Sequence, residues 1–108
     1  PHGLANAVVL PIVLEDYGSA VYGKLARLAT LSQVACEGTE AERAKAFISH
    51  IRQMNEHMGI PEHLPQIREE DIVQMAVWAD QEANPLYPVP VIYDKKHFEE
   101  VIRKVAGK

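Results

Sequence analysis

Residues 3–16 are predicted to form a helix that is apolar on every side. At 3.6 residues per turn, its apolar side chains point to every side of the helix axis and do not form a single stripe. Such a helix is normally buried in the centre of a larger domain. Pro11 lies inside this helix. Because proline has no N–H, it removes the hydrogen bond to the carbonyl of Ala7 and should bend the helix there. The chain therefore begins with a helix that needs packing partners on all sides.

The next two predicted helices are amphipathic, and the second of them has clear end signals. The first covers residues 19–35, with a core stripe at alternating steps of four and three. The second begins after Thr39, which forms a T-x-x-E capping-box pattern with Glu42. It ends near Gly59, which occupies the place of a left-handed C-terminal cap, and Pro61 prevents its continuation.

Two more helices are predicted in the second half of the chain. Three acidic residues at 69–71 suit a helix N-terminus, and that helix extends to residue 83. Residues 84–93 contain three prolines and are predicted to form an extended, irregular strap. Asp94 then suits the N-cap position of a last helix. Since no segment alternates convincingly as a strand would, we expect one all-α domain over residues 1–108, a bundle of about five helices.

Composition and charge narrow the possible functions. The chain has 108 residues, 47% of them hydrophobic, which suits a single domain with a packed core. Its net charge of −4 and the lack of a basic stripe argue against nucleic acid as a partner. The single cysteine, Cys36, allows no intrachain disulfide and favours the cytoplasm. The apolar run at residues 4–14 is too short to span a membrane and lacks the flanks of a signal peptide, so we expect no membrane partner.

His2 is the main candidate for chemistry. It stands at the mouth of the apolar helix, and Asn6, four residues on, lies on the same helix face. A buried polar face on such a helix needs partners, because an unpaired buried polar group costs about 1–3 kcal/mol. A bound metal or a plain hydrogen bond would serve equally well. Imidazole suits Fe(II) or Zn(II), but these ions need three or four ligands, and this chain offers no obvious companions.

The other chemistry-bearing residues are predicted to have structural roles. Cys36 suits an apolar position at a helix end, and the acidic residues 69–71 complement a helix dipole. Three methionines are predicted to fill the core: Met54, Met58 and Met75. The remaining histidines are predicted to be solvated surface residues: His50, His57, His63 and His97. The sequence has no glycine-rich phosphate loop and no nucleophile elbow, so any nucleotide chemistry must come from another part of a longer chain.

Several short motifs occur in a specific order along the chain. Residues 1–11 read P-H-G-L-A-N-A-V-V-L-P, residues 59–61 read G-I-P, residues 69–72 read E-E-D-I, and residues 83–85 read A-N-P. This combination resembles the iron-containing (group III) alcohol dehydrogenases. The signature of that family ends in P-H-G-x-x-N-A-x-x-L-P and carries a metal-binding histidine. The resemblance covers essentially the whole chain, and its specificity lies in the combination of motifs.

The resemblance implies the C-terminal part of a dehydroquinate synthase-like helical domain. By position, His2 matches the last metal-binding histidine, and Asn6, Asn84 and Pro85 would lie behind that ligand or near the substrate. The other ligands and the nucleotide-binding domain would precede Pro1, so we interpret the start of this chain as a cut end. Members of the family use Fe(II), with Zn(II) as a substitute, and NAD(P) to interconvert a primary or secondary alcohol with its aldehyde or ketone.

The resemblance also leads to expectations for the isolated 108-residue chain and for the assembled protein. The isolated chain should be inactive and should bind no cofactor tightly, and the assembled protein should be a homo-oligomer. The alternative interpretation is a small helical protein-interaction module without catalytic activity, in which His2 is merely a buried polar residue. A dinucleotide-binding region encoded upstream of Pro1 would favour the enzyme, whereas a start codon close to Pro1 would favour the module.

Overall fold

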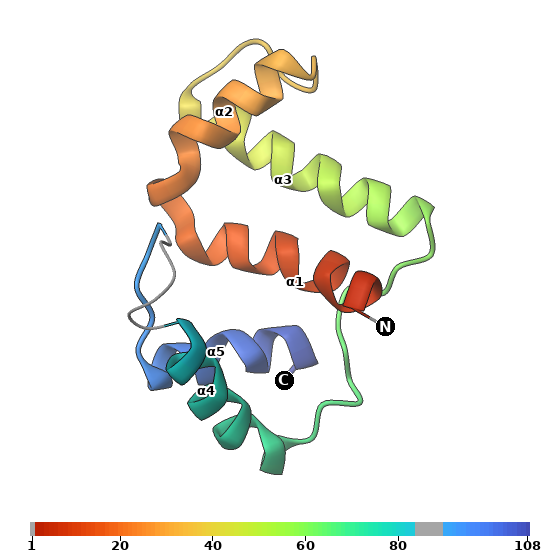
Figure 1. The fold of residues 1–108 in the computed structure, drawn as a ribbon. Helices are drawn as coiled ribbons and strands as arrows, with labels where there is room; N and C mark the ends of the chain where they lie inside the picture. The colour runs from red at the N-terminus through yellow and green to blue at the C-terminus, as the bar shows by residue number, and fades with distance from the viewer. Residues whose placement is uncertain (1, 84–89) are drawn as a thin grey trace. The chain divides into compact units, whose positions relative to one another are not determined.

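The computed structural model of the chain describes residues 2–83 and 90–108, without the side chains of residues 2, 82 and 83. In this part of the chain five α-helices and one 3-10 helix follow one another, and no strand occurs (Figure 1). The all-α class predicted from the sequence is therefore confirmed. The helices divide into two compact units, of which the first ends at Glu62 and the second begins at His63.

Helix α1 (His2–Tyr17) continues through Pro11. Because Pro11 has no N–H, the carbonyl oxygen of Ala7 lacks its usual helical donor. The side chain of Asn55 on α3 (Glu40–His57) supplies a donor instead, since its Nδ2 lies 2.9 Å from that oxygen in a partly buried hydrogen bond. Backbone carbonyls removed from water are almost always paired in this way. The proline therefore creates an acceptor inside α1 that a second helix fills.

A short 3-10 helix, η1 (Gly18–Val21), joins α1 to α2 (Tyr22–Leu31). Gly18 has a φ of +57°, in the left-handed region that glycine enters without steric cost, so the chain changes direction there. The helix predicted over residues 19–35 is thus too long at its start, because its first turn has 3-10 geometry.

The same prediction is too long at the other end, because α2 ends at Leu31. The chain folds back over the last turn of the helix, and the N–H groups of Val34 and Ala35 both donate to the carbonyl of Ala29, at 2.9 and 3.2 Å. Ser32 Oγ also donates to the carbonyl of Leu28 at 2.6 Å. The two bonds to Ala29 occupy a carbonyl that another helical turn would have paired with the N–H of Gln33, so the helix ends here.

Both ends of α3 are as predicted. Thr39 Oγ1 accepts a hydrogen bond from the N–H of Glu42 at 3.1 Å, and Glu42 Oε1 accepts one from the N–H of Thr39 at 3.4 Å. This reciprocal pair is the capping box that the T-x-x-E pattern predicted. Gly59, just beyond the C-terminus of the helix, has the left-handed φ of +75° that a C-terminal cap requires.

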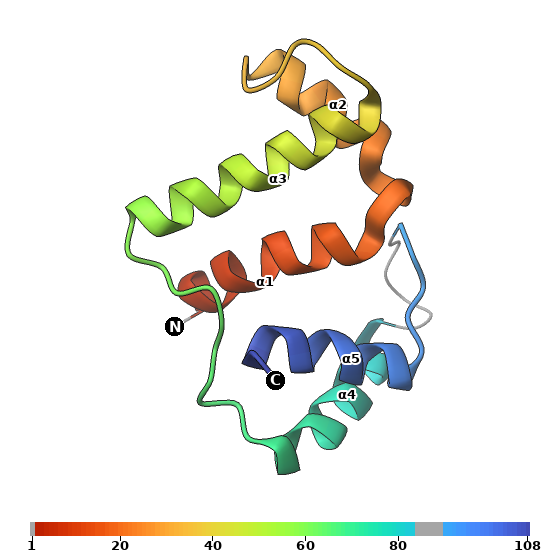
Figure 2. The same cartoon turned by 180° about the vertical axis from the view of Figure 1, so that it is seen from behind.

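The first unit is built around α3, which packs against both α1 and α2 (Figures 1 and 2). Arg52 of α3 also forms an ion pair with Glu15 near the end of α1. The buried cluster at the centre of the unit consists of Val21, Leu25, Ala44 and Ile48. Partly buried residues that surround it are Leu14, Tyr17, Tyr22 and Phe47.

The stretch Gly3–Leu31, which joins α1, η1 and α2, is long and apolar enough to cross a membrane by length and composition. A core helix of a soluble protein and an N-terminal signal sequence meet the same criteria. Glu15 and Asp16 lie in the middle of the stretch, where a bilayer makes charged side chains costly. The stretch is therefore weak evidence for a membrane span, and 22% of its most apolar window is buried in the structure.

The second unit consists of α4 (Glu69–Ala83) and α5 (Lys95–Ala106), which pack against each other. Asp94 is the N-cap of α5 as predicted, since its Oδ1 accepts a hydrogen bond from the N–H of His97 at 2.7 Å. The buried residues that these helices contribute are Ile72, Ala76, Val101, Val105 and Ala106. Of the predicted strap at residues 84–93, residues 84–89 lie outside the described residues, and residues 90–93 are not helical.

The loop that leads into α4 is tied to the C-terminal end of α5. His63 Nδ1 lies 2.9 Å from the carbonyl oxygen of Lys104, and the N–H of Leu64 donates to the carbonyl of Val105 at 2.7 Å. Lys108 Nζ donates to the carbonyl of Ile67 at 2.8 Å. The first two contacts satisfy orphan carbonyls at the end of α5, and all three hold the loop in place.

Candidate metal-binding site

His2 is the first residue of α1, so its backbone stands at the mouth of the helix as predicted. Its side chain lies outside the described part of the structure. Asn6, one turn further along, is exposed, and the buried polar face predicted for His2 and Asn6 is therefore not formed at Asn6. Asn84 and Pro85, the other two residues assigned to the site by resemblance, lie outside the described residues.

Two side chains of α3 hold α1 in place. Asn55 Nδ2 donates to the carbonyl of Ala7 at 2.9 Å, and Arg52 forms an ion pair with Glu15. One contact lies in the first half of α1 and the other near its end, so the helix that begins with His2 is fixed at two points. The sequence did not predict this role of Asn55. The missing N–H of Pro11 could have indicated that a side chain must pair with Ala7.

The described residues do not form a complete metal site. Among residues 2–83 and 90–108, no group of three or more histidine, cysteine, aspartate or glutamate side chains is placed to hold a metal ion. A structural or catalytic Zn(II) or Fe(II) centre needs three or four protein ligands. The chain could contribute His2, whose side chain lies outside the described part, as one such ligand.

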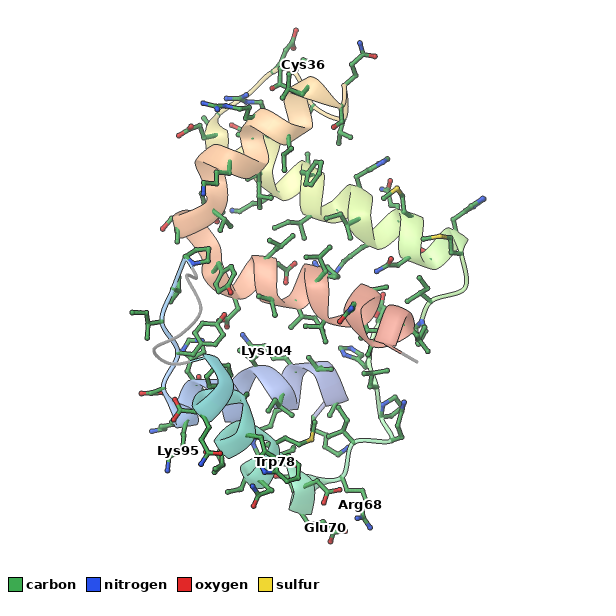
Figure 3. All side chains as sticks on the ribbon, viewed as in Figure 1. Cys36, Arg68, Glu70, Trp78, Lys95 and Lys104 are labelled. Atoms are coloured by element: carbon green, nitrogen blue, oxygen red, sulfur yellow. The ribbon has the colours of Figure 1, made fainter. Side chains whose placement is uncertain are left out.

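The acidic residues at the start of α4 form ion pairs, as their interpretation as structural residues suggested. Arg68 contacts Glu70 at 2.9 Å and Asp71 at 3.0 Å, and Arg103 of α5 pairs with Glu69. Figure 3 shows Arg68 and Glu70 together at the beginning of α4. Two arginines offset two of the three negative charges, so these carboxylates suit a helix N-terminus better than a cation site.

The predictions for the other candidate side chains are mixed. His57 and His63 are exposed as predicted, whereas His50 and His97 are half-buried. Cys36 does not occupy an apolar position at a helix end but is exposed in the connection between α2 and α3 (Figure 3). The prediction that Met54 and Met58 fill the core is wrong, because they are 46% and 64% exposed near the end of α3.

The end of α1 has one electrostatic feature that sequence reasoning missed. Burial raises the pKa of the Tyr17 hydroxyl above its ordinary value, and the neighbouring Asp16 carboxylate raises it further. Tyr17 packs against the core cluster of the first unit. Both causes disfavour the tyrosinate, so the neutral phenol persists to higher pH in the folded chain.

Comparison with known proteins identifies the family. The profile of the Fe-containing alcohol dehydrogenase family, C-terminal, matches residues 1–106. The lactaldehyde reductases of Escherichia coli strain K12 and of Escherichia coli O157:H7 are each 35% identical to this chain over 79 residues. That alignment covers 70% of this chain and 21% of either relative. No solved structure matches significantly. With its all-α fold and a family match over nearly its whole length, the chain belongs to the Fe-containing alcohol dehydrogenase family.

Proposed function

We propose that this chain forms the C-terminal helical part of an iron-dependent, NAD(P)-linked alcohol dehydrogenase and contributes His2 as one metal ligand. The observation that carries the proposal is the family match over residues 1–106, together with the place of the P-H-G-x-x-N-A motif at the mouth of α1. A metal bound at such a centre supplies Lewis-acid polarisation of the substrate oxygen, while the nicotinamide exchanges the hydride. Ligands and domains beyond this chain complete the enzyme.

The role we assign to the rest of α1 is to hold His2 in position. A metal ligand must keep its geometry to within a fraction of an ångström, which requires a fixed backbone. The Asn55 and Arg52 contacts support this role, because they fix α1 against α3 on both sides of Pro11. We further propose that Asn6, Asn84 and Pro85 lie near the ligand or the substrate, by their positions in the family motifs.

The substrate class we infer is a small primary or secondary alcohol and the corresponding aldehyde or ketone. The relatives are lactaldehyde reductases, and this name supports a small aldehyde as substrate. The cofactors would be Fe(II), with Zn(II) as the possible substitute, and NAD(P). We also infer a nucleotide-binding domain beside this helical part, since the chain spans only 21% of the length of these relatives. We infer in addition that the whole protein is a cytoplasmic homo-oligomer.

The test compares two histidine substitutions in the full-length protein that carries this chain. His2→Gln should lower the bound iron at least about tenfold and abolish NAD(P)-dependent alcohol oxidation, because the neutral amide is a much poorer metal ligand than imidazole. His57→Gln, at the exposed end of α3, is the matched control and should change neither quantity. Iron is measured by elemental analysis, and folding by circular dichroism and thermal melting.

Two results would contradict the proposal. Retention of iron and of turnover by His2→Gln would remove His2 from the metal site. Tight, stoichiometric iron or zinc binding by the 108-residue chain alone would contradict the inference that the remaining ligands lie outside it. We expect the isolated chain to be inactive and to bind metal only weakly, because one imidazole cannot compensate a divalent ion for its lost hydration.

A further inference from the structure

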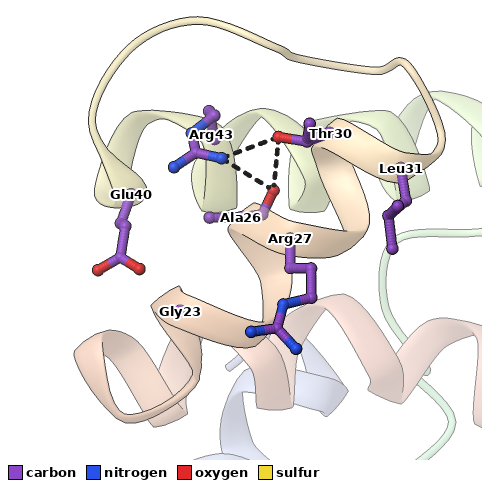
Figure 4. A pocket seen from close by; sticks show the side chains of 7 residues that line it. All are labelled: Gly23, Ala26, Arg27, Thr30, Leu31, Glu40 and Arg43. Atoms are coloured by element: carbon purple, nitrogen blue, oxygen red, sulfur yellow. Dashed lines mark hydrogen bonds between the residues drawn. The ribbon is translucent and has the colours of Figure 1, made fainter.

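Two of the five arginines of the chain make no ion pair with the described residues, and both line the same pocket. Arg52, Arg68 and Arg103 each pair with a carboxylate. Arg27 on α2 and Arg43 on α3 do not, and they border a pocket of about 290 Å³ between these helices (Figure 4). In a chain with a net charge of −4, two arginines that line one pocket and form no ion pair with the described residues indicate a site for an anion.

Arg43 is held rigidly without being neutralised. Its Nη1 donates to Thr30 Oγ1 at 2.8 Å and to the carbonyl oxygen of Ala26 at 3.4 Å, as the dashed lines in Figure 4 mark. Both acceptors are uncharged. A guanidinium carries five N–H donors in a planar fork, so fixing one nitrogen also orients the other two. The N–H groups of Nε and Nη2 have no acceptor among the described residues, and they are therefore available to a ligand.

The charges that line the pocket favour a monoanion. Glu40 is the one acidic residue among its lining residues, and it forms no ion pair with either arginine in the described structure. Two arginines and one glutamate leave a single positive charge, which one carboxylate neutralises. A phosphate dianion would add a further negative charge beside Glu40. The planar fork of arginine also matches a carboxylate in two parallel hydrogen bonds.

The size and remaining lining of the pocket favour a small ligand with some apolar surface. A volume of about 290 Å³ lies at the lower end of the range of roughly 300–1,000 Å³ typical of small-molecule sites. Leu31, which is 73% exposed, supplies the apolar surface among the lining residues, whereas Ala26 is 1% exposed. We propose that this pocket binds a small monocarboxylate with a short apolar carbon chain. The proposal does not depend on the metal centre, because the pocket is formed wholly by α2 and α3.

The test uses butyrate as the probe and the full-length protein that carries this chain. Butyrate should shift the backbone amide resonances of Gly23, Thr30 and Leu31 in a saturable manner, with a Kd on the order of millimolar for one charge-assisted fork in an open pocket. Butyramide, which has the same shape without the charge, should cause no saturable shift. Inorganic phosphate should bind more weakly than butyrate.

Substitutions of exposed residues assign the binding to the pocket. Arg27→Gln should weaken butyrate binding at least about tenfold, whereas Glu40→Gln should strengthen it several-fold by removing the opposing charge. Lys24→Gln is the matched control, because Lys24 is an exposed cation on α2 outside the pocket, and it should change the Kd by less than about twofold.

Each contrary result overturns the proposal in a distinct way. Equal weakening by Lys24→Gln and Arg27→Gln would mean diffuse attraction to surface charge. Equal shifts with butyramide would mean that the carboxylate is not recognised, and tighter binding of phosphate would assign the pocket to a different anion. Dissociation of an oligomer by butyrate, seen by analytical ultracentrifugation, would mean that a protein carboxylate normally fills the pocket.

Discussion

Helices α1 and α5 show two different ways of specifying a helix. Helix α5 has an aspartate N-cap, Arg103 and Lys104 in its last turn and a left-handed glycine at its end. Its buried residues, Val101, Val105 and Ala106, lie on one side. Helix α1 has no acidic residue in its first turn, no basic residue in its last turn and a proline inside. It buries Val8 and Ile12 while leaving Leu10 47% exposed.

The difference shows where the information that shapes each helix is located. Local sequence provides the ends and the buried face of α5, because capping and dipole effects act within one turn. The interruption of α1 at Pro11 is compensated by Asn55, which is far away in sequence. Helix α1 has apolar side chains on all sides, and the described residues cover only some of these sides. Helix α5 is therefore specified locally, and α1 depends on its surroundings.

The largest expected effect comes from replacing one apolar side chain with aspartate, either on α5 or on α1. Val101→Asp should destabilise the protein by more than about 4 kcal/mol in any context, because it buries an unpaired carboxylate. Leu10→Asp should cost less than about 1 kcal/mol in the 108-residue chain but several kcal/mol in the full-length protein. Urea denaturation of both variants in both chains measures the difference. If Leu10→Asp were equally mild in the full-length protein, α1 would be a surface helix like α5.

The next effect tests the pairing of Asn55 with Ala7. Asn55→Ala should destabilise the chain by about 1–3 kcal/mol, because it leaves the carbonyl beside Pro11 without a donor. Pro11→Ala restores the backbone donor, so Asn55→Ala should cost clearly less in that background. A double-mutant cycle by chemical denaturation measures this coupling. Gln53→Ala, an exposed change on the same helix, is the control, and purely additive effects would refute the pairing.

A smaller effect distinguishes the C-terminal ends of the two helices. Gly107→Ala should cost more than about 1 kcal/mol, because the residue has a φ of +78° and the new Cβ would lie 3.2 Å from the His63 ring. Gly18→Ala, at a φ of +57° with open space around it, should cost about 1 kcal/mol from the backbone alone. Thermal melting compares the two variants. Equal costs would mean that the contact between His63 and the end of α5 is loose.

The smallest effect concerns alkaline pH at the end of α1. The pKa of Tyr17 is raised on folding, so the unfolded chain loses its proton first and the stability contributed by the neutral phenol falls as pH rises above about 10. Tyr17→Phe should make the dependence of stability on pH less steep in that range. The effect should be modest, because Tyr17 is only partly buried. Denaturation midpoints at pH 9 and above measure it, and an unchanged slope would contradict the assignment.

Local signals in the sequence predicted most helix ends. The capping box at Thr39, the left-handed Gly59, the acidic start of α4 and the N-cap Asp94 all appear in the structure as predicted. Each of these signals acts through hydrogen bonds or dipoles within a few residues, so no knowledge of the fold is needed. The end of α2 was missed because no glycine or proline marks it. The chain turns there through backbone bonds to Ala29.

Features that depend on a distant partner could not be predicted. Met54 and Met58 were predicted to fill the core because they are flexible and apolar, but that property does not show whether another element covers them. The role of Asn55 needed the knowledge that α3 lies beside α1. In the candidate site, the family motif placed His2 at the start of α1, whereas no group of three or more candidate ligands occurs among the described residues, which do not include the His2 side chain.

The hydrogen bond between Asn55 and Ala7 also has a consequence for the order of folding. It connects residues 48 positions apart, so the loop between them must close before the bond can form. Until α3 has docked, the first turns of α1 contain a carbonyl with no protein donor. We expect these turns to be the last part of the first unit to gain protection from hydrogen exchange, and the first to lose it. The segment that begins with His2 would then become ordered only after the rest of its unit.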